Sequence, residues 1–452
     1  MDIYEDYKDS GVSWLGEVPE HWPLQPGLAI MYENKSKNTG MVRNSVLSLS
    51  YGKIRVKDES ELPGLVPESF ETYQLVDPGD LIFRPTDLQN DKTSLRSSIS
   101  EFEGIITNAY LNFRFKDGAV PKYYHYFFRA IDNNKLIYGL GSGLRQNISF
   151  EDFKRFPFPV PPLQEQQSIA DFLDEKTAKI DQAIAIKEKE IQLLKERRQI
   201  LIQELVTGKK VWDGSAWTAP AETKDSGVDW IGEIPKHWEV RKLKYLTRKI
   251  GSGITPNGGA LNYLDNGVPL LRSQNVHFTG IDWEKVAYIS PDIHRQMSNS
   301  QVQYGDVLLN ITGGSIGRCA VNFLQSEANV NQHVCIVRPN NAISPIFLNL
   351  LLSSELGQGQ IWYYQQGGGR EGLNFQNLKN FIFTYPPRNE QLEISRLFDI
   401  IDTENDKAIS IKMKEIEKLK EYKTVLINDV VTGKLRVHAG SGKQLTKDLL
   451  YS

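Results

Sequence analysis

The chain has 452 residues, of which 40% are hydrophobic and 24% are charged, and its formal net charge is −3. This length allows two to four domains, each large enough for its own core, and the composition is that of an ordinary soluble globular protein. No apolar run approaches the ~18 residues of a membrane span, and the opening MDIYEDYKDS is acidic where a signal peptide is basic. These features argue against secretion and membrane spanning, and they predict a cytoplasmic protein.

The charge distribution and the cysteines narrow the class further. No segment is basic enough to predict DNA binding from bulk charge, so such a function would need local patches or a partner. The two cysteines, Cys319 and Cys335, indicate a reducing compartment. Both lie in strand-like stretches, where we expect buried structural thiols.

Near its start the chain carries a motif that it repeats halfway along. DSGVSWLGEVPEHW runs from Asp9 to Trp22 and DSGVDWIGEIPKHW from Asp225 to Trp238, with ten of fourteen positions identical. A period close to half the chain indicates a duplicated module, because solenoids and propellers repeat every ~20–50 residues. We expect structural or capping roles for His21 and His237. The repeated tryptophans, expected to anchor packing in both copies, are Trp14, Trp22, Trp230 and Trp238.

Each copy of this motif leads into a region rich in short β-like runs, residues 23–156 and 239–381. Gly, Asn, Asp and Pro interrupt the runs, as loops between strands require. Both regions contain a Gly-Asp pair before an apolar run and close with a Gly-rich loop that carries an arginine, Arg145 or Arg370, 225 positions apart. The frame is therefore duplicated, whereas the middles of the two regions differ widely.

A long helix is predicted after each globular region. PFPVPPLQEQQSIADFLD (157–174) corresponds to IFTYPPRNEQLEISRLFD (382–399), and the Gly- and Pro-free stretches that follow end in ELVTGK and DVVTGK. The proline pairs mark the helix starts, and Gly208 and Gly433 mark the ends. At about 1.5 Å per residue, some 44 residues make a rod of roughly 65 Å.

Apolar residues in both predicted helices follow the spacing of a coiled-coil seam. Its members are Ile180, Ile184, Ile191, Leu194, Leu201 and Leu205 in the first helix and Ile409, Ile416, Leu419, Leu426 and Val430 in the second. Basic residues interrupt the seam at matching places, Lys187 and Arg198 in one helix and Lys412 and Lys423 in the other. We predict that the helices pack on one another with these basic side chains extending out of the seam. Two long helices could also be a mere dimerisation handle.

The sequence argues against catalysis by this chain. A DNA amino-methyltransferase would need an Asn/Asp-Pro-Pro-aromatic tetrapeptide, and both Pro-Pro pairs stand instead at helix starts. No G-x-x-x-x-G-K-[ST] phosphate loop occurs, and GLGSGL (139–144) lacks the strand–loop–helix context of a dinucleotide site. The seven histidines show no metal-ligand spacing.

Taken together, the motifs resemble those of the specificity subunit of type I restriction–modification enzymes, from about Asp9 to Arg436. The resemblance rests on the paired opening motifs, the PPLQEQ and PPRNEQ helix starts, and the VTGK ends. It also rests on SGITPNGG (252–259), GDVLLNITGGSIGRCAV (305–321) and NQHVCIVRP (331–339), which are typical of one version of the variable domain.

The resemblance implies a non-catalytic DNA-recognition subunit of a bacterial defence system. Each globular part would be a target recognition domain that reads half of a bipartite sequence in double-stranded DNA. The long helices would set the distance between half-sites and dock two methyltransferase subunits. Those partners would bind S-adenosylmethionine and methylate a flipped adenine, and motor-nuclease subunits would supply ATP- and Mg-dependent cleavage. No cofactor or metal is expected in this chain.

Candidate DNA-contacting residues are polar side chains in Gly-rich or strand-end loops. Arg suits guanine, Asn and Gln suit adenine, and Lys suits phosphate, although Gly, Asn and Ser are also ordinary turn formers. In the first domain the candidates are Arg84, Thr86, Asp87, Gln89, Asn90, Lys92, Arg145, Gln146 and Asn147. In the second domain they are Ser252, Thr255, Asn257, Arg272, Gln274, Asn275, Thr312, Ser315, Arg318, Arg370 and Asn374.

We therefore predict an α/β (α+β) protein in which two globular recognition domains alternate with two long helices forming an antiparallel coiled-coil spacer, with a pseudo-twofold internal repeat. The expected segments are recognition domain 1 (1–160), spacer helix 1 (161–209), a linker (210–224), recognition domain 2 (225–385), spacer helix 2 (386–436) and a C-terminal tail (437–452). A coiled-coil scaffold whose globular domains bind protein or another ligand is the alternative. An enzyme of unknown type is a third, weakened by the missing motifs.

Overall fold

The computed structural model describes residues 2–58, 69–86, 88, 95–140, 147–256, 259–365 and 372–438, without the side chains of residues 261 and 262. The chain forms two compact units. Unit 1 consists of Met1–Glu188 together with Met413–Ser452, and unit 2 is the contiguous stretch Lys189–Lys412. Each unit therefore contains one globular body and half of each long helix.

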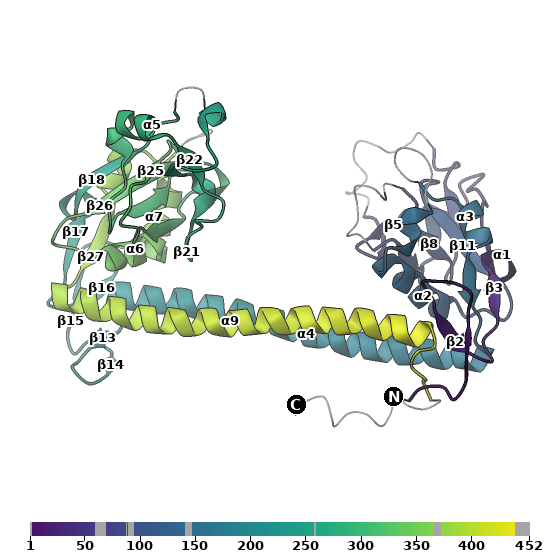
Figure 1. Ribbon diagram of the computed structural model, residues 1–452. Helices are drawn as coiled ribbons and strands as arrows, with labels where there is room; N and C mark the ends of the chain where they lie inside the picture. Colours follow the sequence, from purple (N-terminus) through teal and green to yellow (C-terminus); the bar gives the residue numbers. More distant parts are fainter. Residues whose placement is uncertain are drawn as a thin grey trace. The chain divides into compact units, whose positions relative to one another are not determined.

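Unit 1 is built around a four-stranded antiparallel sheet in the order β4-β11-β8-β9, of which Figure 1 labels β8 and β11. The strands are β4 (Met31–Glu33), β11 (Leu111–Phe115), β8 (Leu81–Phe83) and β9 (Ser97–Ile99). Helix α2 (Pro121–Asn133) packs against the sheet through Phe128, whose ring lies 5.9 Å from that of Phe83 and 5.8 Å from that of Phe113. Burial of these large apolar rings holds the body together.

Shorter elements complete unit 1. Its paired strands are β1 (Tyr7–Asp9) with β2 (Glu17–Pro19), β3 (Leu24–Pro26) with β12 (Pro157–Pro159), β5 (Leu47–Ser50) with β6 (Lys53–Val56), and β7 (Gln74–Val76) with β10 (Gly104–Ile106). Its short helices are α1 (Gly27–Ile30), α3 (Phe150–Lys154) and a 3-10 turn at Leu136–Gly139.

Unit 2 repeats the central sheet in the equivalent order β18-β26-β23-β24. These strands are β18 (Thr247–Ser252), β26 (Val334–Pro339), β23 (Val307–Asn310) and β24 (Cys319–Val321). A second sheet, β22-β19-β25, comprises β22 (Ala287–Ile289), β19 (Val268–Leu271) and β25 (Asn329–Val330). Helices α6 (Pro345–Ser353) and α7 (Glu355–Gln365) cover the body beside the central sheet (Figure 1).

The remaining elements of unit 2 are short. Its strand pairs are β13 (Val211–Trp212) with β14 (Trp217–Thr218), β15 (Thr223–Asp225) with β16 (Glu233–Pro235), β17 (Glu239–Lys242) with β27 (Ile382–Tyr385), and β20 (Val276–His277) with β21 (Gly280–Ile281). Its short helices are α5 (Pro291–Gln296), α8 (Phe375–Lys379) and the 3-10 turns Leu243–Tyr245, Gly259–Asn262, Ser273–Asn275, Ser298–Ser300 and Gly313–Ser315.

The Gly-Asp pair found in both globular regions fixes the same sheet position twice. Asp80 is buried next to β8 and accepts from Arg114 Nε of β11 at 2.9 Å. Asp306 is buried next to β23 and accepts from Arg338 Nε of β26 at 2.7 Å. A buried carboxylate needs such a partner to offset its lost hydration. The duplicated motif is thus a sheet-locking ion pair.

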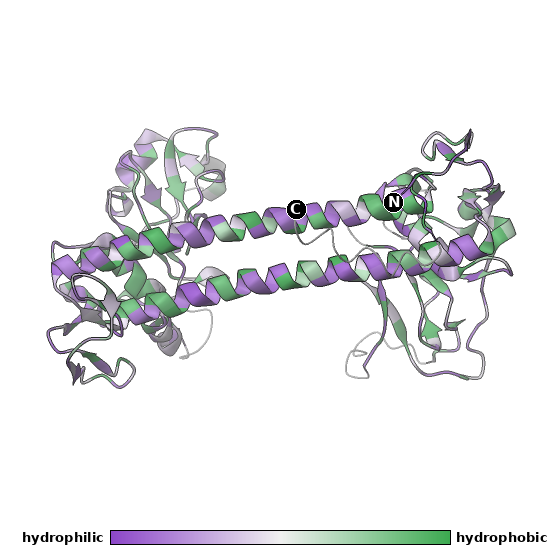
Figure 2. Cartoon of the chain, turned by 90° about the horizontal axis from the view of Figure 1, so that it is seen from below, coloured by the Kyte–Doolittle hydropathy of each residue, from purple (hydrophilic) through white to green (hydrophobic). Residues whose placement is uncertain are grey.

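The long helices are α4 (Leu163–Thr207) and α9 (Arg388–Val431), and within each unit the two pack antiparallel. All seam residues are buried or half-buried, which confirms the predicted coiled coil. Figure 2 shows hydrophobic and hydrophilic residues interspersed along both helices. No described helix is both long and apolar enough to cross a membrane.

The basic interruptions of the seam do more than extend out of it, because each one forms an ion pair with the opposite helix. In unit 1, Lys187 Nζ lies 2.6 Å from Glu415 and Lys423 Nζ lies 2.7 Å from Asp181. In unit 2, Lys412 Nζ lies 2.5 Å from Glu190. The fourth pair, also in unit 2, joins Arg198 and Asp402, with Nη2 3.1 Å from Oδ2. These pairs fix the helix register more than they add stability.

Each copy of the opening motif contacts the start of one long helix and the end of the other, which accounts for its repetition. In unit 1, buried Trp22 donates through Nε1 to Glu165 Oε2 at 3.2 Å, and His21 Nε2 lies 3.0 Å from the same oxygen at the start of α4. Gly433, after the end of α9, packs so tightly that a Cβ there would lie 2.3 Å from a proline ring carbon and 3.0 Å from Trp22. We call this arrangement the helix clamp of unit 1.

Unit 2 builds the same clamp with the helices exchanged. Trp238 Nε1 donates to Glu390 Oε2 at 2.8 Å and His237 Nε2 lies 2.7 Å from Glu390 Oε1, at the start of α9. Gly208, after α4, lies as close to Trp238 as Gly433 lies to Trp22 in unit 1. The structural role expected for both histidines therefore matches their contacts.

The other two repeated tryptophans do not behave alike. Trp14 is half-buried and stacks on Phe156 with ring centroids 5.5 Å apart. Trp230 is 57% exposed, so its prediction as a packing anchor is wrong. The cause lies in the neighbouring elements, because Trp230 lies beside α7 at the rim of an open pocket. The cysteines, in contrast, are free and buried as expected, and burial raises the pKa of Cys319 and of Cys335 to about 12.

Candidate nucleic-acid interface

Five chain segments of unit 2 meet where β23 ends and β26 begins. Asn310, the last residue of β23, donates through Nδ2 to the carbonyl of Ser273 at 2.8 Å. The backbone N–H of Asn331 donates to Leu271 O at 3.1 Å, and that of Gly253 donates to Asn331 O at 3.1 Å. Leu373 N also donates to Ile311 O at 2.7 Å. Loops that the sequence singled out separately thus form one surface.

Glycine makes this convergence possible. A Cβ on Gly253 would lie 1.7 Å from the carbonyl oxygen of Val330, and a Cβ on Gly372 would lie 2.6 Å from Thr312 Cγ2. No side chain fits either space. The Gly-rich composition of these loops therefore reflects close backbone packing.

A chain of four hydrogen-bonded side chains lies along this surface. Thr255 Oγ1 bonds Gln332 Oε1, Gln332 Nε2 lies 2.9 Å from His333 Nε2, and His333 Nδ1 lies 2.6 Å from Thr312 Oγ1. Thr255 and Gln332 are exposed, whereas His333 and Thr312 are half-buried. We call this set the polar chain. It joins two predicted candidates, Thr255 and Thr312, to two residues that sequence reasoning did not select.

The RSQN loop lies beside the polar chain, and one of its residues, Asn275, does not fit the predicted DNA contact. Asn275 is fully buried, accepts from Arg272 N at 3.1 Å, and donates to the carbonyls of Asp282 and Lys285 at 3.2 Å. With no exposed surface, it shapes the loop and cannot meet a base. Gln274 is exposed, and the half-buried Arg272 donates to Lys285 O at 3.1 Å.

The other described candidates of unit 2 have different surroundings. Ser252 is half-buried at the end of β18 and donates to Gly253 O at 3.3 Å. Asn374 caps α8 by accepting from Gln376 N at 2.7 Å, the expected alternative role of a turn-forming residue. Ser315 and Arg318 lie in the loop between β23 and β24, both half-buried, and the Arg318 guanidinium has no hydrogen bond or ion pair to another described residue.

In unit 1 the candidates occupy the equivalent end of β8. Arg84 and Thr86 follow that strand, and Ile148, next to Asn147, donates to Pro85 O at 3.0 Å. A fully buried arginine, Arg96, ties this loop together by donating to Thr86 O at 2.7 Å. Sequence reasoning missed Arg96, because a buried arginine and a base-reading arginine look alike in a sequence. The candidates that lie outside the described residues are Asp87, Gln89, Asn90, Lys92, Arg145, Gln146, Asn257 and Arg370.

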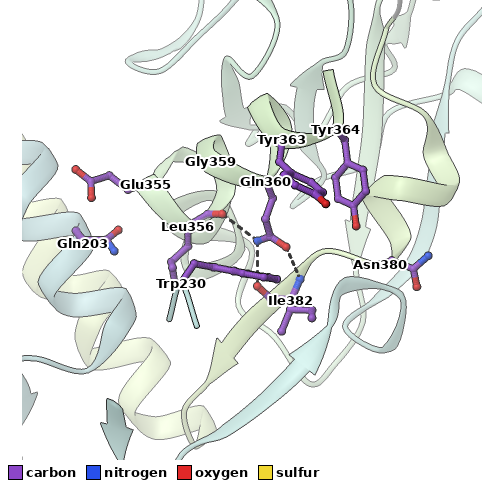
Figure 3. A pocket seen from close by; sticks show the side chains of 10 residues that line it. All are labelled: Gln203, Trp230, Glu355, Leu356, Gly359, Gln360, Tyr363, Tyr364, Asn380 and Ile382. Atoms are coloured by element: carbon purple, nitrogen blue, oxygen red, sulfur yellow. Dashed lines mark hydrogen bonds between the residues drawn. The ribbon is translucent and has the colours of Figure 1, made fainter. Parts of the chain in front are cut away.

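Unit 2 also has an aromatic pocket of about 490 Å³ (Figure 3). Trp230, Tyr363 and Tyr364 line it together with Ile382, and Tyr363 is 73% exposed. The amide of Gln360 is fully engaged inside, accepting from Ile382 N at 2.8 Å and donating to Ile382 O at 3.0 Å, as the dashed lines in Figure 3 show. The pocket is therefore mostly apolar.

The described residues contain no cluster of His, Cys, Asp and Glu side chains that could hold a metal ion. The most strongly perturbed histidine lies in α2. Burial, reinforced by the charge of Arg129, lowers the pKa of His125 to about 3. Arg129 donates to His125 Nε2 at 3.2 Å and to Gly52 O at 2.7 Å, which is a structural arrangement.

Comparison with known proteins gives this architecture a family. The family model described as "Type I restriction modification DNA specificity domain" matches residues 97–196 and 235–420. The chain belongs to this family. Both globular bodies and both long helices take part in the match.

Individual specificity subunits are similar to this family member. The MjaVIII specificity subunit of Methanocaldococcus jannaschii is 29% identical over 302 residues, covering 66% of this chain and 66% of the relative. The EcoBI specificity subunit of Escherichia coli is 27% identical, covering 74% and 68%. A putative MjaX specificity subunit of Methanocaldococcus jannaschii is 25% identical, covering 94% and 96%.

A solved chain from work on complex assembly and conformational transition of the type I R-M system shares the fold. It is 14% identical, with a TM-score of 0.66, and the match covers 92% of this chain and 99% of that one. The fold predicted from the sequence, two recognition domains with a coiled-coil spacer, is confirmed for this specificity-family chain. The relatives are named specificity subunits of restriction enzymes, and the matching family model is that of a DNA specificity domain, so this family member is not itself the enzyme.

Proposed function

We propose that this chain reads a bipartite DNA target, with one half-site for each unit. The observation that carries the proposal is the repeated frame with divergent loops. Both units build the same four-stranded sheet, locked by the same Asp–Arg pair, and the loops at the same end of that sheet differ. A duplicated frame with two different loop sets suits two different base sequences.

The proposal accounts for the net charge of −3. Phosphate contacts supply most of the affinity in DNA complexes, and base-edge contacts supply the sequence information. A subunit that works inside a larger complex can leave much of the phosphate neutralisation to its partners. Its own loops then need a few polar groups such as those of the polar chain.

The partners follow from the pseudo-symmetry. The clamps present helix starts and ends in the same way in both units, so two copies of one methyltransferase subunit can dock on one chain. Two motor-nuclease subunits complete the complex in the cytoplasm. The partners bind S-adenosylmethionine, ATP and Mg, and this chain binds none of them.

Methylation sequencing tests the proposal. DNA is taken from cells that express the chain with its methyltransferase partner, and residues 23–156 are exchanged for those of another family member in a parallel strain. The expected result is a bipartite methylated motif of which one half changes with the exchange. Absence of any motif, or a motif indifferent to the exchange, would favour a coiled-coil scaffold that binds protein instead.

A further inference from the structure

We propose that Gln332 is a base-reading residue of unit 2 that recognises an adenine, and that Thr255 and His333 are the residues that position it. This inference rests on the proposed function and adds a residue and a base to it. It starts from the polar chain, in which each side chain is hydrogen-bonded to the next along the loops at the end of β23.

The backbone around Gln332 is held from three sides. Asn331 N donates to Leu271 O at 3.1 Å, and Asn331 O accepts from Gly253 N at 3.1 Å. His333 N donates to Asn331 Oδ1 at 3.1 Å, and the carbonyl of His333 accepts from Ile311 N at 3.0 Å. The turn that carries Gln332 is thus tied to the ends of β18, β19 and β23, although Gln332 itself is exposed. Rigid support under an exposed polar side chain is the arrangement that recognition requires.

The hydrogen bonds of the chain fix the orientation of the amide. A neutral His333 that donates from Nδ1 to Thr312 Oγ1 has an acceptor at Nε2, and this acceptor faces Gln332 Nε2 at 2.9 Å. The opposite end of the amide, Oε1, then accepts from the Thr255 hydroxyl. With the amide placed as in the structure, all three contacts are satisfied in this one direction, and they hold the amide plane from both ends.

The hydrogen-bonding groups that the amide has left unused match those of adenine. A glutamine amide has two N–H donors and two carbonyl lone pairs, and the polar chain uses one of each. One donor and one acceptor of this exposed side chain are therefore left for a ligand. In the major groove, adenine presents an acceptor at N7 beside a donor at N6, which glutamine binds with two hydrogen bonds. Guanine presents two acceptors and does not satisfy the amide oxygen.

A phosphate contact is the competing role for an exposed glutamine. Such a contact would use only the donor and would not need the amide oxygen to be oriented, and its loss would weaken binding equally at every sequence. The two-sided restraint by Thr255 and His333 favours base reading, because a phosphate contact gains little from a fixed amide plane.

The test uses the full chain expressed with its methyltransferase partner, methylation sequencing, and titration of the purified complex with duplexes carrying each of the four base pairs at every position of the wild-type motif. Gln332→Ala should relax one position in one half-site and reduce discrimination there roughly 5- to 150-fold. Gln332→Glu should shift that position from adenine toward cytosine, whose N4 amino group donates to a carboxylate. Thr255→Val should relax the same position to a smaller extent.

Gln325→Ala is the matched control. Gln325 is an exposed glutamine in the loop that follows β24. Val321, the last residue of β24, pairs with Val307 at the end of β23 opposite to the polar chain, so the Gln325→Ala variant should keep the wild-type motif. Thermal unfolding identifies variants that act through the fold, and Gln332→Ala, which truncates an exposed side chain, should melt like the wild type.

The outcomes separate the two proposals. No methylated motif with the wild-type chain would refute the proposed function. A wild-type bipartite motif that Gln332→Ala and Gln332→Glu leave unchanged would refute the role of Gln332 alone. Equal weakening for all four base pairs would assign Gln332 to phosphate and overturn base reading.

Discussion

The buried ion pair between Asp306 and Arg338 should be the most sensitive polar contact of unit 2. The Asp306 side chain has 0% exposure and that of Arg338 has 12%. The carboxylate accepts from Arg338 Nε at 2.7 Å, from Arg338 Nη2 at 2.8 Å and from Gln303 N at 2.6 Å. Replacing Asp306 by Asn puts an NH₂ group against one of these donors and leaves the guanidinium without a counter-charge. Breaking a buried pair in this way costs about 3–5 kcal/mol.

The equivalent pair in unit 1 supplies a matched comparison. Asp80 accepts from Arg114 Nε at 2.9 Å, but the Arg114 side chain is 28% exposed and can recover hydration when its partner is lost. Asp80→Asn should therefore cost less, about 1–3 kcal/mol.

Hydrogen exchange resolved by peptide is the appropriate assay, because the two units need not unfold together. Asp306→Asn should raise exchange in the strands of unit 2 by about two to four orders of magnitude at the expected cost, and leave unit 1 unchanged. Adding Arg338→Met should recover much of the loss, since it removes the uncompensated charge. A larger effect of Asp80→Asn, or equal exchange in both units for Asp306→Asn, would refute this reasoning.

Three further predictions test the clamps and the buried groups. Gly208→Ala should destabilise unit 2 by about 2 kcal/mol or more in denaturant unfolding, because φ is +73° and the new Cβ would lie 2.3 Å from a proline ring carbon. Gly227 has the same φ of +73° but no atom within 4 Å of its Cβ position, so Gly227→Ala should cost about half as much. Trp22→Ala should cost about 3–5 kcal/mol and Trp230→Ala under about 1 kcal/mol, because Trp22 is 0% and Trp230 57% exposed; equal melting shifts would contradict this. The pKa of His125 is lowered to about 3 in the folded protein, so on acidification the unfolded chain takes up this proton before the folded chain does. The free energy of unfolding of unit 1 should therefore fall by a few kcal/mol as the pH falls from about 6.5 toward 3. His125→Gln should flatten that pH dependence in urea titrations, and an unchanged slope would count against the buried neutral imidazole.

The long helices and the repeated frame could be predicted from the sequence because their signals are periodic. The start of α4 at Leu163 follows a Pro-Pro pair, and its end at Thr207 precedes Gly208, as the sequence indicates. These signals act locally, so no knowledge of distant neighbours is needed.

The candidate site depends on contacts that no local pattern encodes. Asn275 and Gln332 have the same chemistry, but the first is buried in its loop and the second is exposed on a supported turn. The difference arises from segments distant in the chain, such as Gly253 against Val330. Trp230 diverges from Trp14 for the same reason, since α7 lies beside the second of these motifs. Loop membership was predictable, whereas exposure within the loop was not.

The helix clamp of unit 1 also has a consequence for biosynthesis. It joins Trp22 and Glu165 to Gly433, so the ribosome must synthesise the chain as far as Gly433 before the clamp can close. Unit 2, in contrast, is complete once Lys412 has emerged. Domains usually fold in the order of their synthesis. Here the second body can reach its native state while the first still lacks its half of α9, so the amino-terminal body finishes last.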